Sequence, residues 1–172
     1  MIGRVVVGVH GSPGSLHALR FAMGHAHAFG ALLVPVIAWE PPGGDSALRP
    51  YPPMVTEEWA ARAEDSLVAI LEDVLEDGFE RGIRLDAPAE PHVVRGKVGQ
   101  VLVATADQDG DVLVIGAGQH GPLRRAMYGS IPRYCLARAQ CEVIVVPTRS
   151  RSLARQPGRT DSTATITTPL PE

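Results

Sequence analysis

The sequence predicts an α/β fold in which an open parallel sheet carries helices on both faces. Short β-branched runs alternate along the chain with longer stretches that have apolar residues at helical spacing. Five strand-like runs and four helical stretches follow one another, the order expected of right-handed β–α–β units. The length of 172 residues suits one such domain. Ligands of these sheets bind at the carboxyl ends of the strands, where the strand order reverses.

The first β–α unit is marked at both ends of its helix. The valine-rich run Arg4–Val9 predicts a strand. Ser12 suits the N-cap of the following helix, and Pro13 suits its first turn. Gly30 is expected to end this helix, which should therefore extend to about residue 29.

The second strand is expected at Leu32–Trp39, which is apolar throughout and so typical of a buried strand. Pro35 lies within this run and cannot donate a ladder hydrogen bond, so we expect an irregularity in the pairing there. Glu40–Met54 is rich in Pro and Gly and predicts a long loop. An amphipathic helix should then cover about Thr56–Phe79, ended by the glycines at 78 and 82.

The remaining elements are shorter. Strands are expected at Pro91–Arg95, Val112–Ile115 and Glu142–Val146. Helices are expected at Lys97–Ala106 and Ser130–Arg138. We expect residues 1–147 to form the folded domain and residues 148–172 to be a disordered tail, because the tail holds few large apolar residues.

Charge and composition exclude several classes of protein. The net charge of −3 argues against a dedicated nucleic-acid-binding protein, which would carry a basic excess. The sequence has no long uncharged apolar stretch that would suggest a membrane span, and its first residues do not resemble a signal peptide. The two cysteines, Cys135 and Cys141, do not form a CxxC motif and are expected to be reduced thiols. A cytoplasmic location is therefore expected.

The segment from Asp111 to Pro147 contains the strongest functional pattern. An apolar run leads into a glycine-rich loop, and Gly129-Ser130 then opens a helical stretch before the last strand. Backbone N–H groups at a helix start lack intrahelical partners and lie at the positive end of the helix dipole, so they suit a phosphate. This spacing is compatible with a nucleotide site and equally with a plain β–α connection whose glycines only form the turn.

Three stretches together resemble the universal stress protein family: VVVGVHGSPGSLHALRFA, VLVIGAGQHG followed by MYGSI, and ARAQCEVIVVP. The resemblance spans about residues 3–147. It implies a five-stranded sheet of order 3-2-1-4-5, of the adenine nucleotide alpha hydrolase-like type. It also implies ATP as ligand, with Mg as a possible companion, and a homodimer formed through the last strand at Val143–Val146.

One branch of that family binds ATP through a loop of the form Gly, two residues, Gly, nine residues, Gly-Ser. Gly116 matches the first glycine, and Gly129 with Ser130 matches the closing pair. Gln119 stands where the second glycine would be, and Pro132 where a small hydroxyl residue is common. The first strand of ATP-binding members commonly ends in Asp, whereas here the residue is His10.

The candidate nucleotide-binding residues combine this loop with the ends of the first two strands. They are Val9, His10, Ala38, Gly116, Gly118, Gln119, Gly129, Ser130 and Ile131.

Three functions follow from these residues. The first is a stress-linked regulatory module that binds ATP or a related adenine nucleotide and at most hydrolyses it slowly. The second, favoured by the departures at His10, Gln119 and Pro132, is a dimeric interaction protein whose pocket has lost nucleotide affinity. The third is a hydrolase using Ser12 and His10, although the sequence shows no orienting acid and no Walker A lysine. No metal site is expected, because His10 and His120 alone are too few ligands.

Overall fold

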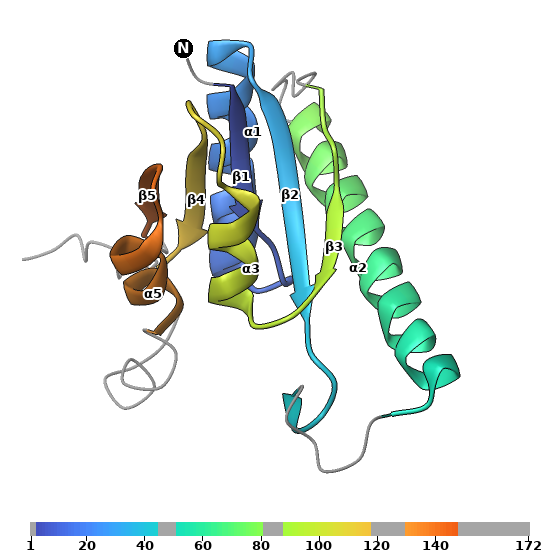
Figure 1. Ribbon diagram of the computed structural model, residues 1–172. Helices are drawn as coiled ribbons and strands as arrows, with labels where there is room; N and C mark the ends of the chain where they lie inside the picture. Colours follow the sequence, from blue (N-terminus) through green and yellow to red (C-terminus); the bar gives the residue numbers. More distant parts are fainter. Residues whose placement is uncertain (1–2, 45–50, 81–87, 118–129, 148–172) are drawn as a thin grey trace, which may run out of the picture.

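The computed structural model describes residues 3–44, 51–80, 88–117 and 130–147 (Figure 1). Its elements in chain order are β1 (Arg4–Gly8), α1 (Pro13–Phe29), β2 (Leu32–Trp39), α2 (Pro53–Glu80), β3 (His92–Arg95), α3 (Val98–Thr105), β4 (Val112–Gly116), α5 (Ser130–Arg138) and β5 (Glu142–Val146). The strands form one parallel sheet of order β3-β2-β1-β4-β5. The predicted fold class and strand order are therefore confirmed.

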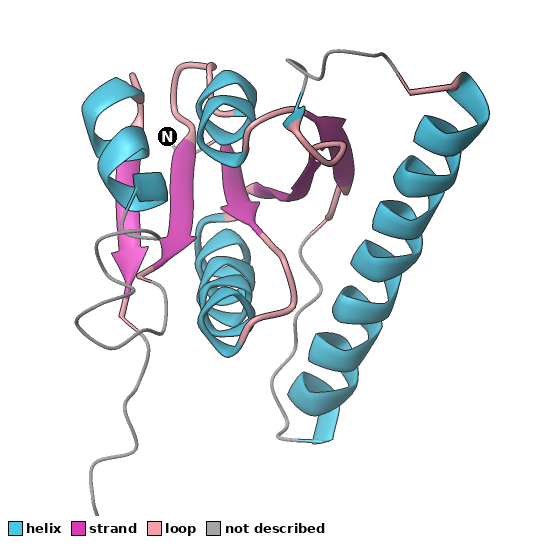
Figure 2. Ribbon diagram, turned by 90° about the horizontal axis from the view of Figure 1, so that it is seen from below, coloured by secondary structure: helices cyan, strands magenta, loops and turns pink. Residues whose placement is uncertain are grey.

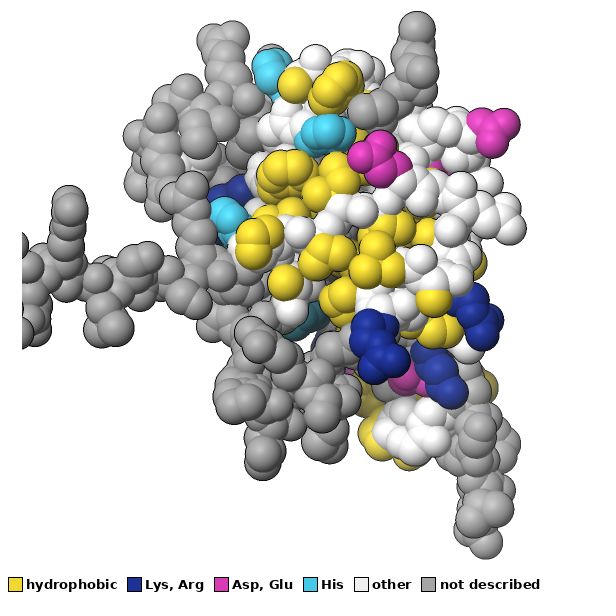
Figure 3. All heavy atoms as spheres, turned by 90° about the vertical axis from the view of Figure 1, so that its left-hand side faces the viewer, with side chains coloured by type: hydrophobic (Ala, Val, Ile, Leu, Met, Phe, Trp, Pro, Cys, Tyr) yellow, Lys and Arg dark blue, Asp and Glu magenta, His cyan; other side chains and the backbone are white. Residues whose placement is uncertain are grey.

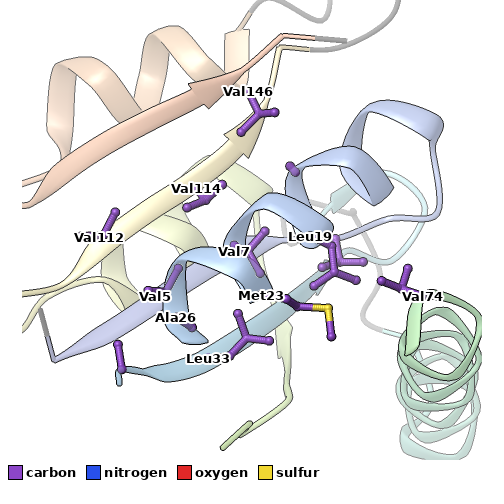
Figure 4. Close-up of a cluster of buried hydrophobic side chains, with 14 of the residues drawn as sticks. Val5, Val7, Leu19, Met23, Ala26, Leu33, Val74, Val112, Val114 and Val146 are labelled. Carbon is purple, nitrogen blue, oxygen red and sulfur yellow. The ribbon is translucent and has the colours of Figure 1, made fainter. Parts of the chain in front are cut away.

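The sheet separates two apolar cores, and helices cover both of its faces (Figure 2). On one face α1 and α2 pack over side chains from the middle strands (Figure 4). On the other face α3 and α5 cover a second cluster that includes Val6, Val34, Leu113 and Cys135. Alternate residues of a strand point to opposite faces, which is why the neighbours Val5, Val6 and Val7 divide between the two cores.

Helix α1 begins and ends as its sequence predicts. Ser12 is the N-cap, and its side chain accepts a hydrogen bond from the Ser15 N–H. Gly30 ends the helix in the left-handed conformation, with φ of 62°, and its N–H bonds back to the carbonyls of residues 26 and 27.

Helix α2 is longer than predicted at its start and does not end at Gly78. Its first residue is Pro53, and the Pro52 carbonyl accepts bonds from the N–H groups of residues 55 and 56. Proline suits this position because the first N–H of a helix has no intrahelical partner. Gly78 is buried, keeps a negative φ, and lies inside the helix, so the expectation that it terminates α2 was wrong. Gly82 lies outside the described residues.

The irregularity expected at Pro35 is present between β2 and β3. Leu33 exchanges backbone hydrogen bonds with residues 88 and 90 on the β3 side. Pro35, two residues further, faces the same edge but has no N–H, and regular pairing with β3 begins only at Val36 and His92. Pairing with β1 on the opposite edge is continuous through this segment, so β2 stays in the sheet.

At the amino end of the sheet a charged pair fastens β1 to the turn before β4. Arg4 donates from Nε to Asp111 Oδ1 at 3.0 Å and from Nη2 to Asp111 Oδ2 at 2.6 Å. The Asp111 carboxylate is buried and also accepts from the N–H of Gln108. This end of the sheet is stabilised by the ion pair, while the opposite, carboxyl end carries the candidate site. Among the described helices, none is long and apolar enough to cross a membrane.

Candidate functional site

The strand order reverses between β1 and β4. From β1 the chain proceeds outward to β2 and then β3, whereas α3 carries it back across the sheet to β4 and then β5. The carboxyl ends of β1 and β4 are therefore neighbours, and the segments that follow them diverge. This is the position at which open α/β sheets bind ligands.

Gly116 at the end of β4 lies directly against the first turn of α1. A Cβ built on Gly116 would be 2.7 Å from the carbonyl O of Gly14, 2.9 Å from its carbonyl C and 3.3 Å from the N of Ser15. The contact is between backbones, so only glycine fits without movement of β4 or α1. The segment after β4 therefore departs from beside the positive end of α1.

The turn that joins β1 to α1 is fixed by hydrogen bonds among its own residues. The backbone N–H of His10 donates to Ser15 Oγ at 3.3 Å, and that hydroxyl donates to the Ser12 carbonyl at 3.0 Å. Gly11 adopts a φ of 73°, which favours glycine, and a Cβ built on it would lie 3.6 Å from Ile70 of α2. Ser12 is engaged as N-cap and Ser15 is 4% exposed, so the turn is a preformed scaffold.

The residues expected to border an adenosine do not all face the same way. Val9 is buried in the core under α1 and α2, and its N–H bonds to the Val36 carbonyl at 2.9 Å. Ala38 is half-buried against the opposite core, under α3. Their side chains thus lie on opposite faces of the sheet. His10, in contrast, is exposed at the carboxyl edge on the same turn that contacts Gly116.

The loop residues divide between described and undescribed segments. Gly118, Gln119 and Gly129 lie outside the described residues, as do His120, Arg124 and Arg125. Ser130 is the first residue of α5, and Ile131 is half-buried against the core beneath α3 and α5. Pro132 is the third helical residue of α5, so this position offers no N–H to a phosphate.

Gly14 and Ser15 are site residues that the sequence did not single out. They form the wall against which Gly116 packs, and Ser15 holds the backbone of His10. The repeated pair in Gly11-Ser12 and Gly14-Ser15 was an available signal, but spacing within α1 does not reveal a contact with a residue about a hundred positions away.

Charged and aromatic groups lie at the carboxyl end of the neighbouring strands. Arg95, the last residue of β3, places its guanidinium carbon 5.8 Å from the ring centroid of Trp39, the last residue of β2. Within the described segments, no three His, Cys, Asp or Glu side chains are grouped as a metal site would require.

Comparison with known proteins gives a family and a set of structural neighbours. The family model described as Universal stress protein family matches residues 1–147. A universal stress protein crystallised in complex with cAMP is 26% identical, with a TM-score of 0.60 over 86% of this chain and 98% of that chain. The Archaeoglobus fulgidus universal stress protein in complex with dAMP is 21% identical, with a TM-score of 0.56 over 84% and 97%. The UspA protein of Lactobacillus plantarum is 22% identical, with a TM-score of 0.58 over 84% and 97%. No curated protein sequence matches this chain.

Proposed function

The chain belongs to the universal stress protein family, and from this premise we propose that it binds ATP or a related adenine nucleotide between the carboxyl ends of β1 and β4. The protein would act as a stress-linked regulator in the cytoplasm rather than primarily as a catalyst. Ser12 Oγ lies 3.2 Å from His10 Nε2, but among the described residues no carboxylate bonds to the His10 ring to orient it as a catalytic base, which supports a binding role over catalysis.

The observation that carries the proposal is the backbone contact of Gly116 with Gly14. It brings the start of the glycine-rich loop to the N-terminus of α1, and the loop ends at the N-terminus of α5. Two helix starts that flank a glycine-rich segment in the sequence suit an anionic ligand. The neighbours solved with cAMP and dAMP support adenine nucleotides as the ligand class. Within this proposal, Gly116, Gly129 and Ser130 would bind phosphate through backbone N–H groups and the Ser130 hydroxyl. Val9, His10 and Ala38 would border the adenosine.

Thermal unfolding with MgATP, ATP plus EDTA, AMP and cAMP tests the proposal. A ligand at about 100 times its Kd stabilises the folded state by about 2.7 kcal/mol, which raises the Tm of a domain of this size by about 5–10 °C. Gly129→Asp should abolish the shift through charge repulsion at the phosphates. Gly24→Asp is the matched control, because Gly24 is exposed on α1 with nothing within 4 Å of its Cβ position.

A shift that survives in Gly129→Asp would refute the placement of the phosphates. Absence of any shift in the wild type, with no nucleotide released on denaturation, would instead support the second function, a dimeric interaction protein. Pro132 favours that alternative, because it removes one N–H from the first turn of α5.

We also propose that the protein forms a homodimer through β5. Residues 142, 144 and 146 direct their backbone groups toward β4, as shown by the bond from the Ala117 N–H to the Val146 carbonyl at 2.8 Å. The backbone groups of Val143 and Val145 therefore face away from the sheet. Antiparallel pairing of two copies about a dyad at Ile144 would match Val143 of one with Val145 of the other.

Side chains on this side of the molecule are suited to a covered surface. Figure 3 shows hydrophobic side chains gathered over the face seen from the β5 side. Phe21 and Phe29 of α1 are 42% and 57% exposed, and the ring of His25 lies between them, stacked on Phe21 and tilted against Phe29. An uncovered apolar edge strand is a liability that pairing removes.

Val145→Pro tests the dimer. The substitution removes an N–H that faces outward, so it should spare the β4–β5 ladder and leave the thermal unfolding of the protomer close to that of the wild type. We expect light scattering to give a dimer mass for the wild type and a monomer mass for the variant. A dimer mass for Val145→Pro would show that the copies associate elsewhere.

A further inference from the structure

The imidazole of His10 is held by a hydroxyl whose own hydrogen-bonding capacity is already partly used. His10 Nε2 lies 3.2 Å from Ser12 Oγ, and Ser12 Oγ accepts the Ser15 N–H at 3.2 Å as the α1 N-cap. A serine hydroxyl has one hydrogen to donate. In the described part of this turn, His10 Nε2 is the acceptor placed to receive it.

The direction of this hydrogen bond decides the tautomer of the neutral ring, because Ser12 Oγ can either donate to Nε2 or accept an Nε2–H with its second lone pair. If Nε2 accepts from Ser12, the ring proton resides on Nδ1. Because His10 is exposed, the Nδ1–H is available at the carboxyl edge of the sheet. With Ser12 as the donor, the turn holds an outward hydrogen-bond donor in place: Ser12 contacts the ring, and Ser15 Oγ accepts from the backbone N–H of His10.

The turn between β1 and α1 contains no acidic side chain. Residues 9–15, VHGSPGS, contain no carboxylate and no side-chain amide, so no anionic side chain is present in the turn to accept a hydrogen bond from a sugar hydroxyl. The positive end of the α1 dipole lies in the same turn. A ligand that brings an anionic oxygen here is favoured over one that brings a hydroxyl donor.

We infer that Ser12 donates to His10 Nε2 and that His10, which borders the nucleoside, is a specificity-determining residue: its Nδ1–H donates to an oxygen of the phosphate attached to that nucleoside and so selects the nucleotide over the free nucleoside. This inference rests on the proposed nucleotide function and adds to it the residue and the hydrogen-bond polarity that set the preference. Ser12 and Ser15 are the positioning residues of this contact.

Two substitutions separate the two nitrogens of the ring. The amide of Asn reaches about the position of Nδ1, so His10→Asn keeps a donor there and loses the Ser12 contact. The amide of Gln reaches about the position of Nε2, so His10→Gln keeps the Ser12 contact and loses the outward donor. Titration calorimetry with AMP and with adenosine measures the effect of each change.

We expect His10→Gln to raise the Kd for AMP about tenfold, equal to about 1.4 kcal/mol, and to leave the Kd for adenosine nearly unchanged. His10→Asn should retain most of the AMP affinity. Equal losses for AMP and adenosine, or no loss in His10→Gln, would overturn the inference while leaving nucleotide binding intact. Failure of the wild type to bind AMP, ATP or cAMP would overturn the proposed function and this inference together.

A second measurement needs no ligand. Nitrogen-15 NMR of the ring distinguishes the two neutral histidine tautomers, and we expect the Nδ1–H form for His10. A dominant Nε2–H form would remove the outward donor and refute the inference, whatever the affinities are.

Discussion

Substituting alanine for Gly116 tests whether the close approach of β4 to α1 is a structural requirement. The added Cβ would lie 2.7 Å from the Gly14 carbonyl O and 2.9 Å from its C, closer than the 3.0 Å that Cβ atoms in proteins observe. Both contacts are backbone atoms, so they cannot rotate away, and β4 and α1 must separate by a few tenths of an ångström.

Two opposing effects decide how much Gly116→Ala changes the free energy of unfolding. Overpacking of this kind costs about 1–3 kcal/mol, whereas the loss of glycine's freedom in the unfolded chain returns about 0.4–1 kcal/mol. The steric term is larger, so we expect Gly116→Ala to lower the free energy of unfolding by about 1–2 kcal/mol.

The matched control is Gly24→Ala, the same chemical change at an exposed position in α1 with nothing within 4 Å of its Cβ. Here the helix propensity of alanine should raise stability by about 1 kcal/mol. In urea unfolding the two midpoints should move in opposite directions and differ by about 1 M. If Gly116→Ala were as stable as Gly24→Ala, the contact between Gly116 and Gly14 would not be a tight one, and the observation that carries the proposed site would fail.

Two further predictions concern buried groups elsewhere in the fold. Asp111→Asn should cost about 3 kcal/mol, because it leaves the Arg4 guanidinium without its buried charged partner. Asp107→Asn should cost less than about 1 kcal/mol, because that carboxylate bonds to the same Arg4 but its side chain is 68% exposed; similar urea midpoints for the two variants would contradict this. Burial raises the pKa of the Cys135 thiol from 9.0 to about 11, so the folded state retains a proton that the unfolded state loses. The contribution of the Cys135 thiol to the free energy of unfolding should therefore be complete below pH 9 and should decline as the pH rises toward 11. Relative to Cys135→Ala, the free energy of unfolding of the wild type should be about 1 kcal/mol lower at pH 10 than it is below pH 9. A difference between the two proteins that does not depend on pH would argue against a buried thiol.

Much of the architecture could be predicted from local pattern. The alternation of apolar runs and helical spacing gave the order of the elements, and the resemblance to a known family added the strand order. Ser12 and Gly30 could be assigned as helix caps because capping depends on a few neighbouring residues. The irregular pairing between β2 and β3 could be predicted at Pro35, because proline has no backbone N–H to donate.

Local pattern was less informative where packing decides the outcome. Gly78 has the residue type of a helix end, yet it is buried within α2, and tertiary contact overrides its weak propensity for a helix. Sequence spacing could not show that the side chains of Val9 and Ala38 lie on opposite faces of the sheet, and their contact with a nucleoside stays a prediction.

Local sequence was enough to locate the strands and helices, the two ends of α1 and the glycines that follow β4. Three contacts appear only in the folded chain: Gly116 against Gly14, Ser15 with the backbone of His10, and Arg4 with Asp111 across 107 positions. The two groups of features differ in the distance along the chain over which their interactions act. Caps, periodicity and backbone preferences act over a few residues, whereas the separation between β4 and α1 depends on how the whole sheet and its helices pack together.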